Sequence, residues 1–476
     1  MLKIHKGFKR RMAVSLLAGM MLFSACGKTG TKEGNAREVN KITTEADNGN
    51  NGKNGNNGSS LNLNTEVTKK DGGISAEKGK TTNLSASLDK GTVTDPTKEQ
   101  EDAFVRGTAS FSFDMMKSLV AQDKGQNVMI SPDSIITALA MTENGAKDDT
   151  LKCMQQVMCK ELSLDEYNLA LSGFNKKLTG AQEVSFNAAN SIWLKNDGQI
   201  NISQDFLQTN VDYHDAEFYM ADFDEKTVED INGWINDKTK GMIPQMLDKI
   251  NDETLMYLIN AIAFEGEWRE EYTDDQISTD RQFTNAKGET ETVTMLHSTE
   301  QGYISLKDGL GFVKYYKGNE FAYVAILPPE GMGADEYISS ISGEEFIDAY
   351  NNRNTYTDAH VTMPEYTSDY NVSLKDTLMN MGMELAFSDV ADFSKMTANG
   401  ESVLKIGDVL HKTHIEVDRK GTKAAAATIV AMDTEAAVAP EESVIITLDR
   451  PFVYAIVETD TGLPVFLGTV NSVNGQ

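Results

Sequence analysis

The sequence predicts an α+β fold in one large domain, residues 95–476. Segments in which apolar residues recur at helical spacing concentrate early in this stretch, whereas runs rich in β-branched and aromatic residues dominate its later part. Neither an internal repeat nor a regular strand–helix alternation is present, and no second linker divides the stretch. We therefore expect a single domain that is larger than most.

Local signals predict the individual elements. Asp95-Pro96 is typical of a helix start, because proline is tolerated in the first turn. The apolar residues of this first helix recur at helical spacing: Phe104, Phe111, Met115 and Leu119. Further helices are expected at residues 133–143, 227–236 and 373–381. Strands are expected at residues 321–327, 413–417, 444–448 and 451–457.

The first 25 residues predict an export signal. Basic residues up to Arg11 precede an apolar stretch from Met12 to Phe23, and small residues lead to Cys26. This stretch is too short to span a bilayer as a stable helix. Residues 1–25 resemble a bacterial lipoprotein signal, in which Cys26 becomes the lipidated first residue. Phe23 departs from the usual leucine, so an ordinary secretory signal is the alternative. We expect an exported chain, lipid-anchored at the cell surface or extracellular.

Residues 26–94 predict a flexible tether. From residue 27 to residue 94 the chain has no Phe, Tyr, Trp or Met, and Asn, Gly, Lys, Thr and Ser dominate. Such a composition buries too little apolar area to offset the entropy lost on ordering. We therefore expect this segment to hold the folded domain away from the membrane.

Composition excludes several functional classes. The net charge of −28 repels phosphate backbones and anionic lipids, which argues against nucleic-acid binding and against any membrane contact beyond a lipid anchor. The folded part has no basic cluster that could bind heparin. Three cysteines in 476 residues exclude a disulfide scaffold and a four-thiolate metal site.

Catalytic and metal-binding patterns are also absent from the sequence. It has no Gly-x-Ser-x-Gly, no His-Glu-x-x-His and no complete phosphate-binding loop. His411 and His414 lie three apart in a predicted strand, so they point to opposite faces and cannot share a metal. Cys153 and Cys159 are six apart in a helical stretch, where two buried thiols are favoured over a bridge. We expect no enzyme activity, no cofactor and no metal.

One segment near the C-terminus is unusual in its run of small residues. Residues 421–430 read Gly-Thr-Lys-Ala-Ala-Ala-Ala-Thr-Ile-Val, and strands are predicted on both sides. With a period of two, Thr422, Ala424, Ala426 and Thr428 would face one side, and Lys423, Ala425 and Ala427 the other. Small residues could be accepted between two existing strands without steric conflict. An Ala-rich helix or a surface loop is the alternative that these residues alone leave open.

Seven sequence blocks that follow one another along the domain help to interpret this segment. They are residues 127–135, 187–193, 231–234, 258–268, 408–412, 449–452 and 466–468. Together these blocks resemble the serpin family along the whole domain. The resemblance implies three β-sheets, eight or nine helices and an exposed reactive-centre loop.

The resemblance also implies a function. Serpins are serine protease inhibitors that act as suicide substrates: the protease cuts the loop, the cut loop inserts as a strand into the central sheet, and the acyl-enzyme is trapped. The hinge corresponds to Gly421, Thr422, Ala424, Ala425, Ala426, Ala427 and Thr428. No proline interrupts it before Pro440, as strand insertion requires. Arg419 departs from the acidic residue usual before the hinge, which is expected to weaken a local ion pair.

Five further residues acquire roles from the resemblance. Ser131, Ser134, Asn260 and His411 correspond to the shutter, a polar network under the point where the sheet opens. Trp268 corresponds to the residue beneath the site where the loop enters. A buried polar cluster that serves stability alone would explain the same residue types.

The reactive bond is expected between Glu435 and Ala436 when counted from the hinge, or at Ala437-Val438 when counted from the C-terminal side. The small residues favour an elastase-like or subtilisin-like target, whereas cleavage after Glu435 would suit a Glu-directed protease. A cysteine protease is a further class of partner, and we expect a monomer. The alternatives are a non-inhibitory serpin, acting as a binding protein or as a simple protease substrate, and a solute-binding lipoprotein.

Overall fold

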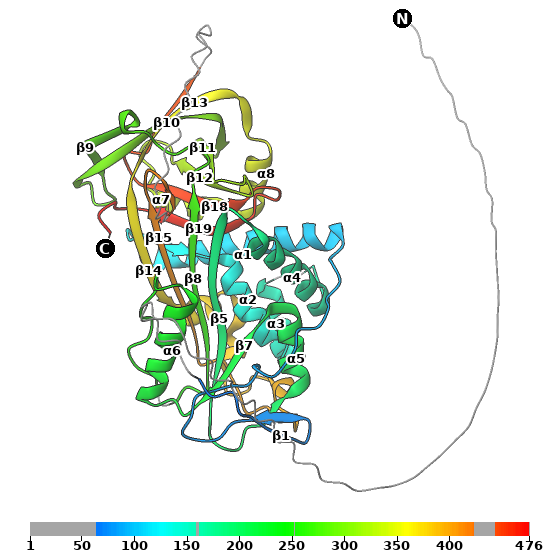
Figure 1. Cartoon of the computed structure of the whole chain (residues 1–476). Helices are drawn as coiled ribbons and strands as arrows, with labels where there is room; N and C mark the ends of the chain where they lie inside the picture. The colour runs from blue at the N-terminus through cyan, green and yellow to red at the C-terminus, as the bar shows by residue number, and fades with distance from the viewer. Residues whose placement is uncertain (1–62, 159–160, 252, 423–442, 476) are drawn as a thin grey trace, which may run out of the picture. The chain divides into compact units, whose positions relative to one another are not determined.

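The computed structural model describes residues 63–158, 161–251, 253–422 and 443–475. Among these residues it contains nine α-helices and three β-sheets, of seven, nine and three strands (Figure 1). This confirms the expected α+β class with three sheets and eight or nine helices. No helix in the described ranges is long and apolar enough to cross a membrane.

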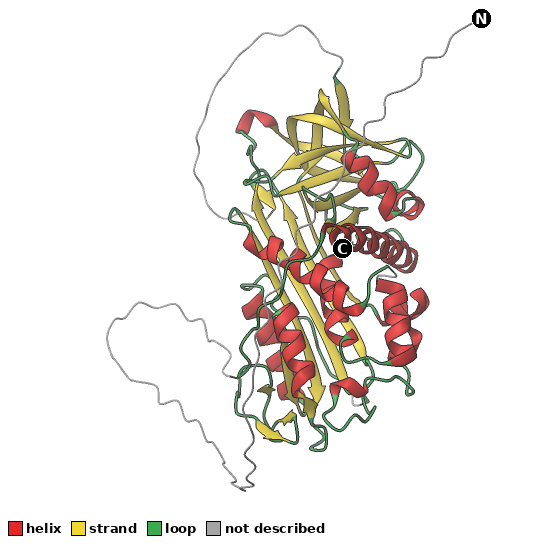
Figure 2. Ribbon diagram, turned by 90° about the vertical axis from the view of Figure 1, so that its right-hand side faces the viewer, coloured by secondary structure: helices red, strands yellow, loops and turns green. Residues whose placement is uncertain are grey.

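The seven-stranded sheet is the centre of the molecule. Its strands lie in the order β14 (Tyr366–Ser373), β15 (Asp408–Val417), β16 (Gly421–Thr422), β8 (Met256–Glu267), β5 (Val184–Lys195), β7 (Glu217–Ala221) and β3 (Thr82–Asn83). Nearly every residue of β8 is buried, because helices cover both faces of the sheet. Figure 2 shows helices packed along these long strands, with the second sheet beyond one end.

The described residues form nine α-helices, which pack around the sheets. They are α1 (Lys98–Gln122), α2 (Pro132–Glu143), α3 (Asp148–Met158), α4 (Leu164–Gly180), α5 (Gln204–His214), α6 (Glu225–Lys238), α7 (Ala334–Ser340), α8 (Gly343–Asn351) and α9 (Lys375–Leu378). The first helix begins at Lys98 rather than at Asp95-Pro96, because the Thr97 hydroxyl accepts from the Gln100 N–H and caps it. Helix α6 lies on the face of the central sheet opposite α2, where Trp234 meets Trp193 and Tyr219.

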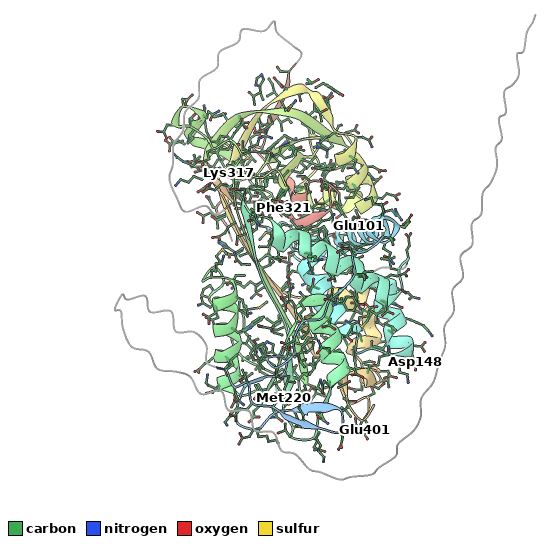
Figure 3. The ribbon with its side chains drawn as sticks, turned by 45° about the vertical axis from the view of Figure 1, so that its right-hand side comes forward. Glu101, Asp148, Met220, Lys317, Phe321 and Glu401 are labelled. Carbon is green, nitrogen blue, oxygen red and sulfur yellow. The ribbon has the colours of Figure 1, made fainter. Side chains whose placement is uncertain are left out.

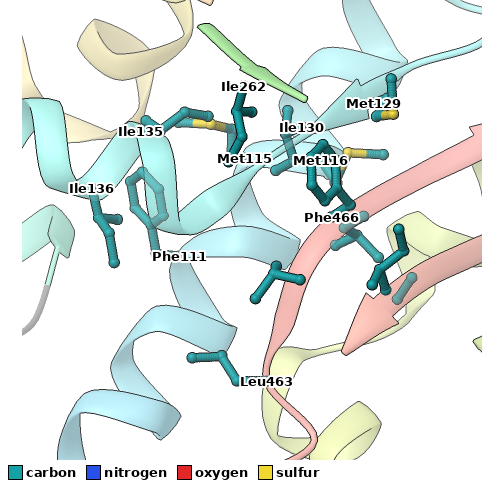
Figure 4. Close-up of a cluster of buried hydrophobic side chains, with 14 of the residues drawn as sticks. Phe111, Met115, Met116, Met129, Ile130, Ile135, Ile136, Ile262, Leu463 and Phe466 are labelled. Carbon is teal, nitrogen blue, oxygen red and sulfur yellow. The ribbon is translucent and has the colours of Figure 1, made fainter. Parts of the chain in front are cut away.

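The nine-stranded sheet holds three of the four predicted strands, those at residues 321–327, 444–448 and 451–457, whereas residues 413–417 belong to β15 of the central sheet. Its order is β17 (Val444–Thr447), β13 (Asn354–Pro364), β10 (Thr290–Leu306), β11 (Gly309–Tyr315), β12 (Phe321–Leu327), β18 (Phe452–Glu458), β19 (Pro464–Val470) and β4 (Met129–Ile130), with β9 (Ile277–Thr284) pairing β10. The core joins this sheet to the first helices: Phe111 and Met115 of α1 lie with Ile135 of α2, Ile130 and Phe466 (Figure 4).

Residues 63–94 correct the predicted tether. Strands β1 (Thr68–Lys70) and β2 (Gly73–Ser75) form a small sheet with β6 (Ile202–Ser203), and β3 extends the central sheet beside β7. Ile74 and Leu84 are fully buried. The average composition of the segment gave no sign of these two buried residues. The rest of the segment is ordered because its strands pair with the edges of other strands. Residues 26–62 of the predicted tether lie outside the described residues.

Candidate functional site

The candidate site is the junction between β15 and β8, here called the seam. These strands pair in parallel from Asp408 opposite Tyr257 to His414 opposite Ala263. Beyond that point β16 lies between them, antiparallel to both. The central sheet is therefore closed along most of the seam and already holds one short strand at one end. Figure 3 places Lys317 at the end of the sheet where β16 enters and Met220 at the other end.

Strand β16 consists of the first two predicted hinge residues. Gly421 lies so close to β8 that a Cβ atom would meet the Gly266 carbonyl oxygen at 2.1 Å, which explains the absence of a side chain. Thr422 is fully buried, and its hydroxyl lies 2.6 Å from the hydroxyl of Tyr316. Thr422 thus faces inward, as the period of two predicts.

The remaining loop residues of the prediction lie outside the described residues. They are Ala424, Ala425, Ala426, Ala427, Thr428, Glu435, Ala436, Ala437 and Val438. The lipidation candidate Cys26 and the residues 1–25 before it lie outside as well.

Trp268, which the resemblance places beneath the site where the loop enters, contacts the turn that precedes β16. Its indole N–H donates to the Asp418 carbonyl at 2.8 Å, and its backbone N–H donates to the Lys420 carbonyl at 2.8 Å. The indole stacks on Tyr316 with ring centroids 4.6 Å apart. Trp268 therefore fixes the turn that delivers the hinge to the seam.

A buried ion pair beside Trp268 was missed by the sequence reasoning. Lys314 Nζ lies 2.9 Å from a Glu300 carboxylate oxygen, and both side chains are at most one-tenth exposed. The ammonium also lies 4.4 Å from the centre of the Tyr272 ring, where a cation–π contact offsets part of its desolvation. These partners are brought together by β10 and β11, and no spacing in the sequence signals them.

Arg419 corrects a second expectation. Arg419 was expected to weaken a local ion pair before the hinge, but it forms ion pairs with two acidic residues. Its guanidinium lies 3.3 Å from Asp274 and 3.8 Å from Glu365, which precedes β14. Burial raises the pKa of Glu365, and the nearby Arg419 opposes that shift. On the outer side of the same entrance, Lys317 pairs with Glu267 and Glu271.

A polar network, here called the seam network, lies under the closed part of the seam. His411 Nδ1 lies 2.5 Å from Asn260 Oδ1 across the β15–β8 pair. The Asn260 amide nitrogen donates to Asn190 Oδ1 at 2.7 Å and to the Ser134 hydroxyl, which itself donates to Asn190 at 3.0 Å. The Ser131 backbone N–H donates to His411 Nε2 at 3.2 Å. The four predicted shutter residues thus meet in one place.

The protonation of His411 follows from these partners. Nε2 accepts from a backbone N–H, so Nδ1 carries the proton and donates to Asn260. Full burial lowers the pKa of His411 to about 3, which keeps the ring neutral. Ser131 contributes through its backbone, since its buried hydroxyl has no partner among the described residues. Asn190 was not predicted, because its role depends on the β5–β8 register.

Among the described residues, neither His414 nor Cys153 belongs to a cluster that could hold a metal ion. His414 lies on the opposite face of β15 from His411, as expected, and pairs with Asp369 at 2.8 Å. In the described ranges no cluster of three or more His, Cys, Asp or Glu could hold a metal ion. Cys153 forms no disulfide and is only partly buried, whereas a buried thiol was expected. Cys159 lies outside the described residues.

Comparisons with known proteins agree with this architecture. A family model described as Serpin (serine protease inhibitor) matches residues 106–473. An uncharacterized serpin-like protein of Thermococcus kodakarensis is 30% identical over 378 residues, which cover 78% of this chain and 85% of that protein. Leukocyte elastase inhibitor A of Mus musculus is 29% identical over 378 residues, covering 76% of this chain and 97% of that protein.

Solved structures give the same assignment of fold. The thermophilic serpin tengpin in its native state aligns with a TM-score of 0.76 and 38% identity, over 82% of this chain and 99% of that chain. Its latent state aligns with a TM-score of 0.68 and 36% identity, over 80% and 100%. Human thyroxine-binding globulin, at 22% identity and a TM-score of 0.70 over 79% and 100%, shows likeness of fold alone.

Proposed function

Because this chain belongs to the serpin family, we propose that it is a protease inhibitor that acts as a suicide substrate. The observation that carries the proposal is β16. Gly421 and Thr422 already occupy one end of the seam, antiparallel to both neighbours, which is the direction that an inserting loop would need. Beyond them the seam is a parallel pair that a further strand can separate.

Continuing the β16 register tests whether the hinge fits. Ala424 would lie beside Phe264, and Thr428 would lie between Asn260 and His411. The inward positions would then hold only small side chains, and the Thr428 hydroxyl would arrive where the Asn260–His411 hydrogen bond now lies. Insertion would therefore exchange one polar partner for another, so that no buried group is left unsatisfied.

The target protease carries out the bond cleavage. The inhibitor determines whether its cut loop inserts before the acyl-enzyme is hydrolysed. The nucleophile of the protease attacks the scissile carbonyl, the peptide bond breaks, and the new amino terminus leaves with the C-terminal fragment. Insertion of the cut loop as a central strand then competes with hydrolysis of the acyl-enzyme. Each residue that enters adds ladder hydrogen bonds on both sides, which drives insertion forward.

We further propose a target with a small specificity pocket, elastase-like or subtilisin-like. The loop carries Ala436, Ala437 and Ala439 around Val438, and such side chains fill small pockets. Similarity to a protein named leukocyte elastase inhibitor A supports this class. Cleavage after Glu435 would indicate a Glu-directed enzyme instead.

The experiment mixes the chain with elastase and with subtilisin, followed by boiling in SDS and electrophoresis. A band at the summed mass would establish covalent trapping, and mass spectrometry of the released fragment would identify the bond. Loop cleavage without that band by every protease that cuts there would contradict inhibition and favour the non-inhibitory alternative.

We also propose that the chain is exported and anchored through Cys26. The basic, apolar and small-residue order of residues 1–25 supports this proposal. Mass spectrometry of the mature N-terminus tests it: a diacylglyceryl-modified Cys26 is expected, and an unmodified N-terminus after cleavage elsewhere would contradict anchoring.

A further inference from the structure

A cavity of about 520 Å³ lies beside the seam network, and its lining includes Asn190 of that network and Ile262 of β8. It is bounded by residues 90–95, which lead into α1, by α4, by the end of α5 and by the central sheet. This volume is in the range of small-molecule sites. The inhibitory mechanism proposed above does not use the cavity, and the inference below does not rest on that mechanism.

The charges that line the cavity do not balance. Five acidic residues and three lysines contribute to the lining. Each lysine already has an acidic partner: Lys176 with Asp95 at 3.1 Å, Lys90 with Asp215 at 3.8 Å, and Lys238 with Glu217 at 2.8 Å. Asp133 and Asp212 have no cationic partner among the described residues. His214 adds no charge, because burial lowers its pKa to about 3.

Asp133 is the more informative of the two carboxylates. It lies in the first turn of α2, is only 6% exposed and faces the Asn175 amide. With the amide nitrogen turned toward it, Asn175 donates to both carboxylate oxygens at 3.0 and 2.9 Å. A buried carboxylate with a neutral partner is costly to ionise, and burial raises the pKa of Asp133 to about 7. A cation in the cavity would relieve that cost.

Asp212 lies at the other side of the lining. One of its oxygens accepts from the Gly91 backbone N–H at 2.7 Å and from the Gln208 amide at 2.7 Å, both neutral donors. The hydrogen bond to Gly91 ties the segment at residues 90–95 to α5, so the wall of the cavity is fixed in place.

The remaining wall combines apolar with polar side chains, and the polar ones include Thr137 and Asn190. Phe186 and Ile262 from the central sheet, Leu178 from α4 and Trp234 from α6 contribute to it. We propose that the cavity binds an aliphatic amine, with its ammonium group at Asp133 and its alkyl chain against Phe186 and Ile262. The two uncompensated carboxylates disfavour an anionic ligand. A purely apolar ligand would leave the buried Asp133 carboxyl group without a charged partner.

The test is calorimetric titration of the full chain with hexylamine at pH 7.5 and physiological salt, which screens diffuse binding to a chain of charge −28. One hexylammonium per chain is expected, and hexan-1-ol, which lacks the charge, should bind at least roughly tenfold more weakly. Asp133→Asn should weaken hexylamine roughly tenfold or more. The control Glu336→Gln removes an equal charge from an exposed position on α7 and should leave the affinity unchanged.

Equal binding of hexan-1-ol, equal loss in both variants, or no heat of binding at millimolar amine would overturn the proposal. A second measurement covers the case in which Asp133→Asn fails to fold. Trp234 lines the cavity, so hexylamine should change the tryptophan fluorescence of the unaltered chain, and Trp234→Phe should remove that change. Binding that leaves fluorescence insensitive to Trp234→Phe would place the amine elsewhere.

Discussion

His411 on β15 and Asn260 on β8 hydrogen-bond directly across the seam, with 2.5 Å between Nδ1 and Oδ1. On the continued register, Thr428 would have to pass between these two residues. The same contact thus closes the intact sheet and must open when the cut loop inserts that far. Four predictions follow from the seam, the residues at its entrance and one buried acid.

Inward and outward hinge positions should respond oppositely to the same substitution. Ala424→Arg would carry a long cation into the interior, so the loop should still be cut but no covalent complex should form. Ala425→Arg, one residue further, should keep trapping because its side chain would face outward. Complex formation is measured by SDS electrophoresis. Thr422→Arg and Ala424→Pro should also give substrates, and trapping at the unaltered rate by Ala424→Arg would rule out insertion in this register.

Removing the Asn260 side chain from its contact with His411 should lower the unfolding free energy of the intact chain. Asn260→Ala leaves the His411 Nδ1–H buried without a partner, which costs about 1–3 kcal/mol of unfolding free energy. Urea unfolding of the intact chain measures this loss. The control Asn371→Ala, at an exposed position on β14, should change stability little. Equal effects of the two variants would show that the contact across the seam does not contribute.

The burial of Glu143 leads us to predict that the free energy of unfolding falls as pH rises. It ends α2, is 1% exposed, and burial raises its pKa to about 8. A carboxyl group whose pKa is higher in the folded than in the unfolded state stabilises at low pH, and this stability is lost as pH rises toward 8. Glu143→Gln should therefore raise the free energy of unfolding at pH 8 by a few kcal/mol and flatten its dependence on pH between about 4.5 and 8. Parallel pH profiles of the variant and the unaltered chain would contradict this.

Charge reversal should test the ion pairs at the entrance to the seam. Arg419→Glu places an acid beside Asp274 and Glu365, and it should lower stability by about 1 kcal/mol, because the side chain is partly exposed. Adding Glu365→Arg should restore part of the loss. A double-mutant cycle of unfolding free energies measures the coupling, and strictly additive effects would show that Arg419 and Glu365 do not interact.

Local sequence patterns predicted the features that depend on neighbouring residues within one strand. They did not predict the contacts that depend on how distant strands pair. The inward face of Thr422 and the opposed faces of His411 and His414 follow from the period of a strand. Asn190 joins the seam network only because β5 places it opposite Asn260, and Arg419 finds its acid only because β14 begins beside it. The order of residues 63–94 was missed because average composition conceals single anchors such as Ile74.

The measurement that tests the central claim most directly compares the thermal melting of the intact chain with that of the chain cut once in the loop. Insertion would add a strand paired on both sides, at about 1 kcal/mol per hydrogen bond. The cut form should therefore melt more than about 10 °C higher than the intact form. An unchanged or lower melting temperature after a single cut would mean that the seam does not accept the loop, and the proposed inhibitory mechanism would be wrong.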